Sequence, residues 1–194
     1  SEELAEEILN QEGEKDIVAA TNVFAHIDDL HDFMKGVKTI LSDNGVFIIE
    51  VPYLVDLIEN NEFDTIYHEH LSYFSVKPLI ELFDQHSMEI IDIEPQEIHG
   101  GSIRVHVANQ GRYEKSRAVK TYRKREQEAS IHSKETLEKF RDRVEKNRQE
   151  LINLINTLHS EGKSIDGLGD PAKGLVMLNY CNFDNNILPY FPAK

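Results

Sequence analysis

The chain of 194 residues has one cysteine, Cys181, and no apolar run long enough to cross a membrane. A single cysteine excludes an internal disulfide and a zinc site of four thiolates, which makes the reducing cytoplasm the expected compartment. The acidic N-terminus lacks the positive start and the apolar stretch of a signal peptide. We therefore expect a cytoplasmic protein without a membrane partner.

Basic residues are also scarce, with 21 Lys and Arg against 35 Asp and Glu, a net charge of −14. This balance argues against general nucleic-acid binding, which needs a basic surface. The charge is uneven, because residues 1–60 hold three basic and fourteen acidic residues, whereas residues 112–149 hold thirteen basic and seven acidic ones. The reversal near Gly111 predicts two domains, 1–111 and 112–194. The basic stretch is either a solvated helical surface or a patch for an anionic ligand or for the acidic half of the molecule.

Two short apolar runs, at residues 16–21 and 46–51, are typical of strands buried on both faces of a parallel sheet. Between them, residues 28–42 have apolar side chains at helical spacing, and residues 2–11 form an amphipathic helical pattern. Strand, helix and strand in this order imply a right-handed crossover.

A helix over residues 76–87 and two strands at 88–95 and 102–109 are expected next, with Gly100 and Gly101 between the strands. This order is a common ending for a doubly wound sheet. The sequence therefore predicts an α/β fold, the C-terminal half of a Rossmann-like sheet.

The pattern is helical from residue 112 to about 160, with Ser133 as a candidate N-cap and Gly162 as a candidate stop. Residues 164–180 then predict a strand, a glycine turn and a helix, which would open a second, small Rossmann-like α/β domain.

The densest polar cluster is residues 64–75, with two histidines, two acids and two tyrosines. Because it follows the strand at 46–51, it is expected near the carboxyl ends of the strands, where open α/β sheets bind ligands. A histidine beside a carboxylate suits a general base, and a tyrosine can donate to a developing enolate oxygen. The alternative is a polar surface loop. A metal site is not expected, because His68 and His70 lack an obvious third ligand.

Three smaller clusters are also candidates. Asn22 and His26 follow the first strand and would align on a helical turn, although His26 could instead cap or pack. Paired glycines after His99 either admit a ligand or form a tight turn. Residues 167–174 form a glycine-rich turn that could cradle a phosphate, with a lysine adding charge.

Together these motifs resemble those of the sugar C-methyltransferases, which use S-adenosylmethionine to methylate a carbon of nucleotide-linked keto-deoxysugars. The resemblance covers nearly the whole chain, and the Tyr-x-Glu-His signature is fairly specific. The matching stretches are ATNVFAHI at 20–27, FIIEVPYL at 47–54, FDTIYHEH at 63–70, HGGS at 99–102, and PAKG at 171–174 followed by LNY at 178–180.

The resemblance implies α-proton abstraction from the sugar and attack of the enolate on the sulfonium methyl. His70 or Tyr67 would be the base, Glu69 would bind the sugar or orient His70, and His26 would lie near the reacting carbon. The substrate and cofactor crevice would be lined by Asn22, His99, Gly100, Gly101 and Lys173. O-methylation of a related sugar and a non-catalytic sugar-nucleotide-binding module are the alternatives.

The chain departs from the family at its start. Family members begin with a cysteine-rich zinc domain and a glycine-rich cofactor loop, but the glycines before residue 100 are only Gly13, Gly36 and Gly45. We therefore expect an internal fragment in which a central strand forms a bare sheet edge. The zinc and the main S-adenosylmethionine contacts would lie outside it, and the fragment alone would bind S-adenosylmethionine poorly. The sugar and the oligomeric state stay open.

Overall fold

The computed structural model describes residues 1–98, 100–168, 172–184 and 187–188. The chain divides into two compact units. The first combines Ser1–Leu57 with Glu69–Ile131, and the second combines Ile58–His68 with His132–Lys194. The segment that contains Tyr67 and His70 thus passes from one unit to the other.

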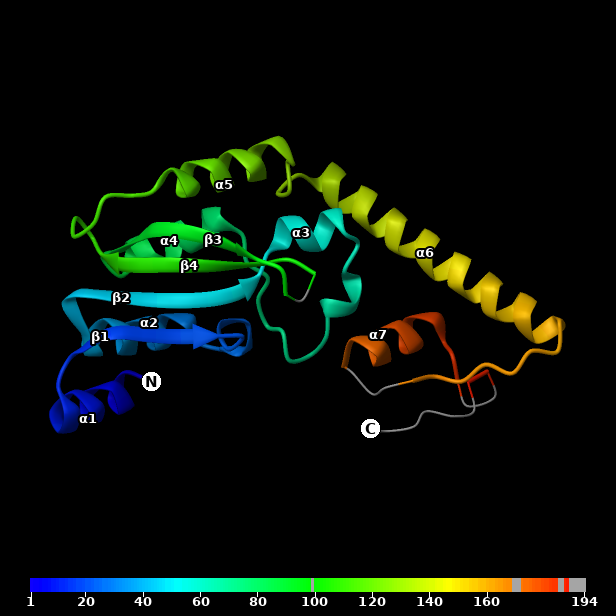
Figure 1. The fold of residues 1–194 in the computed structure, drawn as a ribbon, viewed down its shortest axis with the longest axis horizontal. Helices are drawn as coiled ribbons and strands as arrows, with labels where there is room; N and C mark the ends of the chain where they lie inside the picture. The colour runs from blue at the N-terminus through cyan, green and yellow to red at the C-terminus, as the bar shows by residue number, and fades with distance from the viewer. Residues whose placement is uncertain (99, 169–171, 185–186, 189–194) are drawn as a thin grey trace. The chain divides into compact units, whose positions relative to one another are not determined.

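The first unit is built on a four-stranded sheet in the order β1-β2-β4-β3 (Figure 1). β1 and β2 are parallel and are joined through helix α2, whereas β4 is antiparallel to both of its neighbours. The α/β class and the four strands predicted before residue 110 are confirmed. Their bounds are Lys15–Thr21 for β1, Leu41–Pro52 for β2, Met88–Gln96 for β3 and Ser102–Asn109 for β4.

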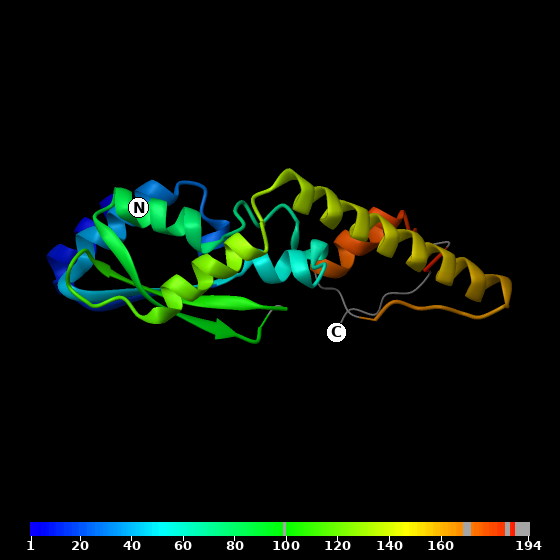
Figure 2. The same cartoon turned by 90° about the horizontal axis from the view of Figure 1, so that it is seen from above.

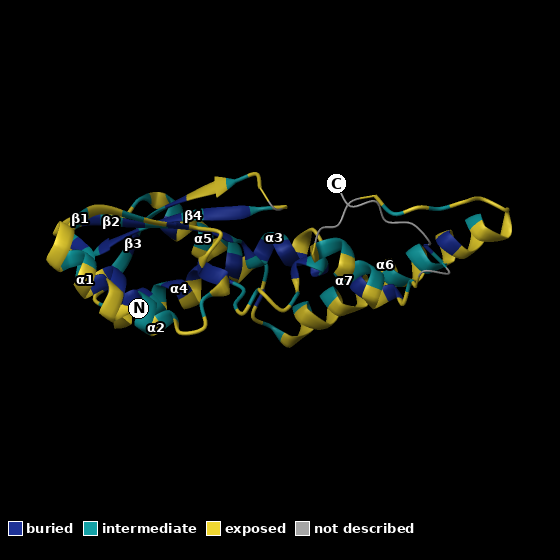
Figure 3. Cartoon of the chain, turned by 90° about the horizontal axis from the view of Figure 1, so that it is seen from below, coloured by how far each residue is buried: buried dark blue, intermediate teal, exposed yellow. Residues whose placement is uncertain are grey.

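Three helices, α1 (Glu2–Glu12), α2 (Leu30–Ile40) and α4 (Val76–Gln85), lie along one face of this sheet (Figures 2 and 3). α2 begins where the carboxylate of Asp29 accepts the backbone N–H of Asp32 at 2.9 Å, which satisfies one of the unpaired N–H groups of the first turn. These helices cover an apolar sheet face and form the core with it.

A buried carboxylate of helix α5 (Arg117–Glu128) binds the helix to other elements of the first unit. Glu126 accepts the backbone N–H groups of Val76 and Lys77, the latter at 3.0 Å, and the hydroxyl of Tyr53 at 3.2 Å. It therefore caps the N-terminus of α4 from a neighbouring helix. Burial and the charge of Glu126 together raise the pKa of Tyr53 above its usual value.

This contact explains why the division into units differs from the domain boundary predicted at residue 111. The change of charge marks the start of a basic helix, but that helix packs on β3 and α4 of the first unit. The long helical pattern is also interrupted, because Ser130 adopts a left-handed φ of 48°. Helix α6 (Lys134–Ser160) then follows its N-cap Ser133, whose hydroxyl accepts the N–H of Thr136 at 3.1 Å, as the sequence predicts.

The second unit contains α6, α7 (Ala172–Cys181) and the short 3-10 helix η2 (Phe63–Thr65). Tyr180 joins them, since its ring centroid lies 5.5 Å from that of Phe63 and its hydroxyl donates to Glu145 at 2.9 Å. Helix α3 (Leu54–Glu59) follows β2. The residues 163–168 form neither helix nor strand in the described structure, so the strand expected to open a second sheet is not seen there. None of the helices in the described ranges is long and apolar enough to span a membrane.

Candidate active site

The candidate site begins where β1 ends. Asn22 directly follows β1 in a left-handed conformation, with φ of 54°, which asparagine tolerates better than most residues. Its backbone N–H donates to the carbonyl oxygen of Glu50 on β2 at 3.0 Å. This turn leads the chain into the short helix η1 (Phe24–His26).

Aromatic packing holds η1 in place. The ring of Phe24 is fully buried, and its centroid lies 5.1 Å from that of Phe74 and 6.3 Å from that of Phe47. The next residue, Ala25, accepts the backbone N–H groups of Leu71 at 2.9 Å and Ser72 at 3.3 Å. The second half of the polar cluster, residues 69–75, is therefore tied to the loop after β1.

The same segment is also tied to the end of β2. Phe74 forms a bridge with Tyr53, and the N–H of Leu54 donates to the carbonyl oxygen of Phe74 at 2.9 Å. Residues 69–75 thus run past the carboxyl ends of both β1 and β2. This is the edge at which ligands bind in open α/β sheets.

Two of the predicted site residues meet at this edge. The rings of His26 and His70 are 5.0 Å apart between centroids and inclined at 69°. Tyr73 adds a third ring, 6.3 Å from that of His70. His26 is exposed and His70 is half-buried. We call these two imidazoles the His26–His70 pair. Histidine is the side chain that enzymes most often use for general acid–base catalysis.

The other predicted residues near this edge are Asn22 and Glu69, both exposed in the first unit. Tyr67 belongs to the second unit, where it is half-buried and its ring centroid lies 6.3 Å from that of His68. Lys173 also belongs to the second unit, and it lies in the first turn of α7 rather than in a glycine-rich turn before a helix. His99 lies outside the described residues.

Gly101 has a local reason to be glycine. Its φ is 135°, and a Cβ atom there would lie 2.6 Å from the Cβ of Asp56, which in turn pairs with Arg125 at 2.6 Å. Its carbonyl oxygen accepts the N–H of Tyr53 at 3.1 Å. The close approach at Gly101 is therefore made by the side chain of Asp56, and the place of Gly100 and Gly101 in a ligand crevice stays a prediction.

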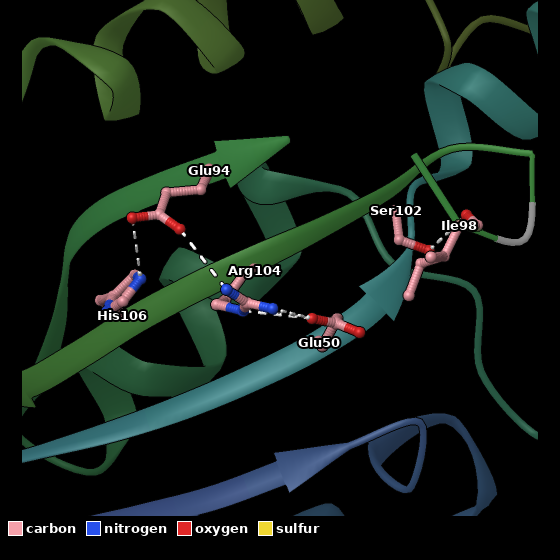
Figure 4. Close-up of polar contacts among 6 residues, drawn as sticks. All are labelled: Glu50, Glu94, Ile98, Ser102, Arg104 and His106. Carbon is pink, nitrogen blue, oxygen red and sulfur yellow. Dashed lines mark hydrogen bonds and ion pairs between the residues drawn. The ribbon is translucent and has the colours of Figure 1, made fainter. Parts of the chain in front are cut away.

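One row of residues crosses the whole sheet beside this site. Thr21, Glu50, Arg104 and Glu94 are register partners on β1, β2, β4 and β3. The Nε and Nη2 atoms of Arg104 donate to Oε2 of Glu50 at 3.1 and 2.7 Å, and Nη1 lies 3.7 Å from Glu94 (Figure 4). We call this row the charged rung.

The sequence analysis missed the charged rung. One signal was present, because Glu50 is an acidic residue inside an otherwise apolar strand and its side chain is only 7% exposed. A buried carboxylate needs a cationic partner, but the identity of that partner depends on strand register. Since the carbonyl of Glu50 holds Asn22, the rung supports the turn on which the His26–His70 pair depends.

The imidazole and phenol side chains at this edge are of types that transfer protons in enzymes. No group of three or more His, Cys, Asp or Glu side chains able to hold a metal occurs among the described residues. The His26–His70 pair offers imidazole nitrogens beside a tyrosine, a combination suited to removing a proton from a bound substrate.

Comparison with known proteins identifies the family to which the chain belongs. Residues 97–193 match the family described as the C-methyltransferase C-terminal domain, and residues 1–93 match the methyltransferase domain. The C-methyltransferase NovU of Streptomyces niveus is 39% identical over 180 residues, which are 92% of this chain and 43% of NovU. The chain thus spans less than half the length of that relative.

The crystal structure of magnesium protoporphyrin IX methyltransferase (ChlM) from Synechocystis PCC 6803 with bound SAH is also similar. It is 11% identical, with a TM-score of 0.39 over 53% of this chain and 48% of that chain, a likeness too low to support an argument. The family matches and the similarity to NovU agree with the motifs at the carboxyl ends of β1 and β2. The chain therefore belongs to the C-methyltransferase family.

Proposed function

We propose that the protein is an S-adenosylmethionine-dependent methyltransferase that methylates a carbon beside the ketone of a nucleotide-linked deoxysugar. The observation that carries the proposal is the His26–His70 pair at the carboxyl ends of two parallel strands. The name of NovU supports carbon as the methyl acceptor. The C–H bond beside a ketone must lose a proton before carbon can act as a nucleophile, so the site needs a base at that position.

The residues of this chain supply the proton transfer. His70 takes the α-proton of the sugar on a ring nitrogen, with Tyr67 as the alternative base. The electron pair of the broken C–H bond moves onto the ketone oxygen, which makes the α-carbon nucleophilic. That carbon would then form a bond to the sulfonium methyl group while the S–CH3 bond breaks and the thioether leaves. A positioned base of this kind typically contributes about 10²–10⁴ to the rate. Glu69 binds the sugar or orients His70, and His26 lies near the reacting carbon.

The residues present fit one side of a site for S-adenosylmethionine. The exposed amide of Asn22 directly follows β1, in a turn that the carbonyl of Glu50 holds. In that position it would contact the cofactor or the sugar. When bound, S-adenosylmethionine supplies an electrophilic methyl group. The remaining cofactor contacts and any zinc are expected outside this chain.

The test is exchange of the sugar α-proton with deuterium from the solvent, followed by NMR in the full-length protein. We expect His70→Ala combined with Tyr67→Phe to slow exchange by at least about 100-fold. His31→Ala is the control, because it removes a histidine whose ring contacts His86 and does not belong to the His26–His70 pair. The control variant should exchange at close to the wild-type rate.

The outcomes separate the alternatives. Unchanged exchange in the double variant would remove both residues from the base role. Transfer of a ¹³C-labelled methyl group to oxygen would instead support an O-methyltransferase. Tight binding of the sugar nucleotide without exchange or methyl transfer would support a non-catalytic binding module.

A further inference from the structure

A groove of about 920 Å³ lies in the first unit between α4, β3 and α5, at a place distinct from the His26–His70 pair. Its apolar lining includes Ile80 on α4, Met88 on β3 and Val119 on α5. Its volume falls within the usual range for sites that hold small organic molecules. The groove is therefore large enough for a ligand with an apolar body.

The wall on the α5 side of the groove is cationic. It includes Arg117, Lys120, Arg123 and Lys124, which recur at the three- and four-residue steps of one helix face. Lys124 pairs with Glu128 at 3.4 Å. The other three side chains are exposed and form no ion pair with any residue that the structure describes.

Helix α6 shows what an ordinary solvated charged helix of this protein looks like. Five of its six Lys and Arg residues are matched along the helix by acidic neighbours, a pattern typical of a solvent-exposed surface. The pairs are Lys134–Glu138, Lys139–Glu135, Arg141–Asp142, Lys146–Glu150 and Arg148–Glu145. Three of the four cations in the wall of α5, Arg117, Lys120 and Arg123, lack this internal matching, although acidic residues outnumber basic ones by 35 to 21 in the chain.

The two acidic residues of the groove do not neutralise this wall. Glu89 accepts from Lys115 at 2.8 Å and from the backbone N–H of Gly111 at 2.7 Å, and the Lys115 contact lowers the pKa of its carboxyl. Asp84 accepts from the side-chain amide of Gln110 at 2.8 Å. Both carboxylates thus have partners other than Lys120 and Arg123, whose positive charge stays available to another anion.

We propose that this groove binds an organic phosphate, with the phosphate on Lys120 and Arg123 and an apolar body over Ile80 and Val119. A guanidinium presents paired N–H groups that match phosphate oxygens, and an ammonium adds a second positive charge. The apolar lining selects a phosphate ester over the inorganic ion. The ester could be a soluble metabolite or a lipid headgroup, because both present the same chemistry to the groove.

The experiment is a ³¹P NMR titration of the full-length protein without a methyl donor, with hexyl phosphate and with inorganic phosphate as probes. Hexyl phosphate is expected to bind at least about tenfold more tightly, since burial of its alkyl chain adds to the charge contact. Flotation with phosphatidylcholine vesicles, with and without phosphatidic acid, tests the lipid source. Binding to the acidic vesicles in addition to hexyl phosphate would assign a lipid headgroup, and binding to hexyl phosphate without them a soluble ester.

Two matched charge reversals locate the site. Lys120→Glu with Arg123→Glu on α5 should weaken hexyl phosphate binding at least about tenfold. Lys139→Glu with Lys146→Glu on α6 changes the net charge equally and should alter it by less than about twofold. Ile80→Ser should remove most of the preference for hexyl phosphate over phosphate.

Equal weakening by both reversals would overturn the proposal in favour of a general charge effect, and so would the absence of saturable binding by either probe. Because the titration measures neither proton exchange nor methyl transfer, its failure leaves the proposed function untouched. If the proposed function fails its own test, the titration still decides whether the groove binds an organic phosphate.

Discussion

The two faces of the four-stranded sheet are built on different physical principles. On one face Phe47, Ile49 and Val51 of β2 are fully buried under helices. On the other face the same strand presents Glu50, which pairs with Arg104 (Figure 4). Arg104 also lies near Glu94, and Glu94 in turn lies near His106. Strand alternation sorts the residues of one strand onto these faces. The apolar face is held by burial, and the charged face is held by a few directional contacts.

The largest expected effect comes from breaking the apolar face. Phe47→Ala removes a fully buried ring whose centroid is 6.1 Å from that of Phe33 and 6.4 Å from that of Phe83. We expect a loss of about 3–5 kcal/mol in the free energy of unfolding, measured by urea denaturation. Ile48→Ala, at the next position but on the charged face, should cost less than half as much. Equal losses would show that both faces are packed alike.

The second prediction concerns the charged face. Arg104→Met leaves the carboxylate of Glu50, with a side chain only 7% exposed, without its cationic partner. We expect a loss of about 3 kcal/mol in the free energy of unfolding, because an uncompensated buried charge is costly. Removing both charges with Glu50→Leu and Arg104→Met should restore stability to within about 1 kcal/mol of the wild type. The double-mutant cycle measures this coupling, and additive losses would mean that the two side chains act independently.

The contrast between the faces also explains what the sequence could reveal. The four strands of the first unit were predicted correctly, because apolar runs and turn residues are local signals. The partner of Glu50 was not predicted, because Arg104 is its neighbour only once β4 has inserted between β2 and β3. Periodicity along one strand carries no information about that order.

The candidate site divides in the same way. Motifs identified His26 and His70 individually, but their contact depends on the hydrogen bonds that Ala25 accepts from the segment after His70. The position of Lys173 was misjudged for a related reason. A glycine-rich stretch predicts a turn, but residues 172–181 continue as a helix. Helix formation there overrides the weak local preference of Gly174.

The third prediction concerns Glu94, the member of the charged rung on β3, and the expected change in the free energy of unfolding is smaller. Glu94 is 47% exposed, and its carboxylate lies 3.7 Å from Nη1 of Arg104. Because solvent screens such a pair, Glu94→Gln should change the free energy of unfolding by less than about 1 kcal/mol. The difference should shrink further in 1 M NaCl. A loss as large as that of Arg104→Met would mean that the rung acts as one unit across the sheet.

The smallest expected effect lies in the helices that cover the apolar face. Nδ1 of His31 on α2 and Nε2 of His86, the residue that ends α4, are 2.9 Å apart, so one ring must donate and the other accept. Burial lowers the pKa of His86 below its ordinary value of 6.5, with smaller contributions from His31 and Lys35. Between the lowered pKa and about pH 6.5, the folded state therefore binds fewer protons at this group than the unfolded state does. Stability from this contact should be complete above about pH 6.5 and should decline as the pH falls through the lowered pKa.

Urea denaturation at a series of pH values checks this expectation. His86→Gln should flatten the decline below about pH 6.5, because the glutamine amide does not titrate. Lys35→Gln should flatten it only slightly, since the lysine charge is the weakest of the three contributions. A decline that steepens in His86→Gln would contradict the assignment. A decline removed fully by Lys35→Gln would show that long-range charge, rather than burial between two helices, makes the covered face sensitive to acid.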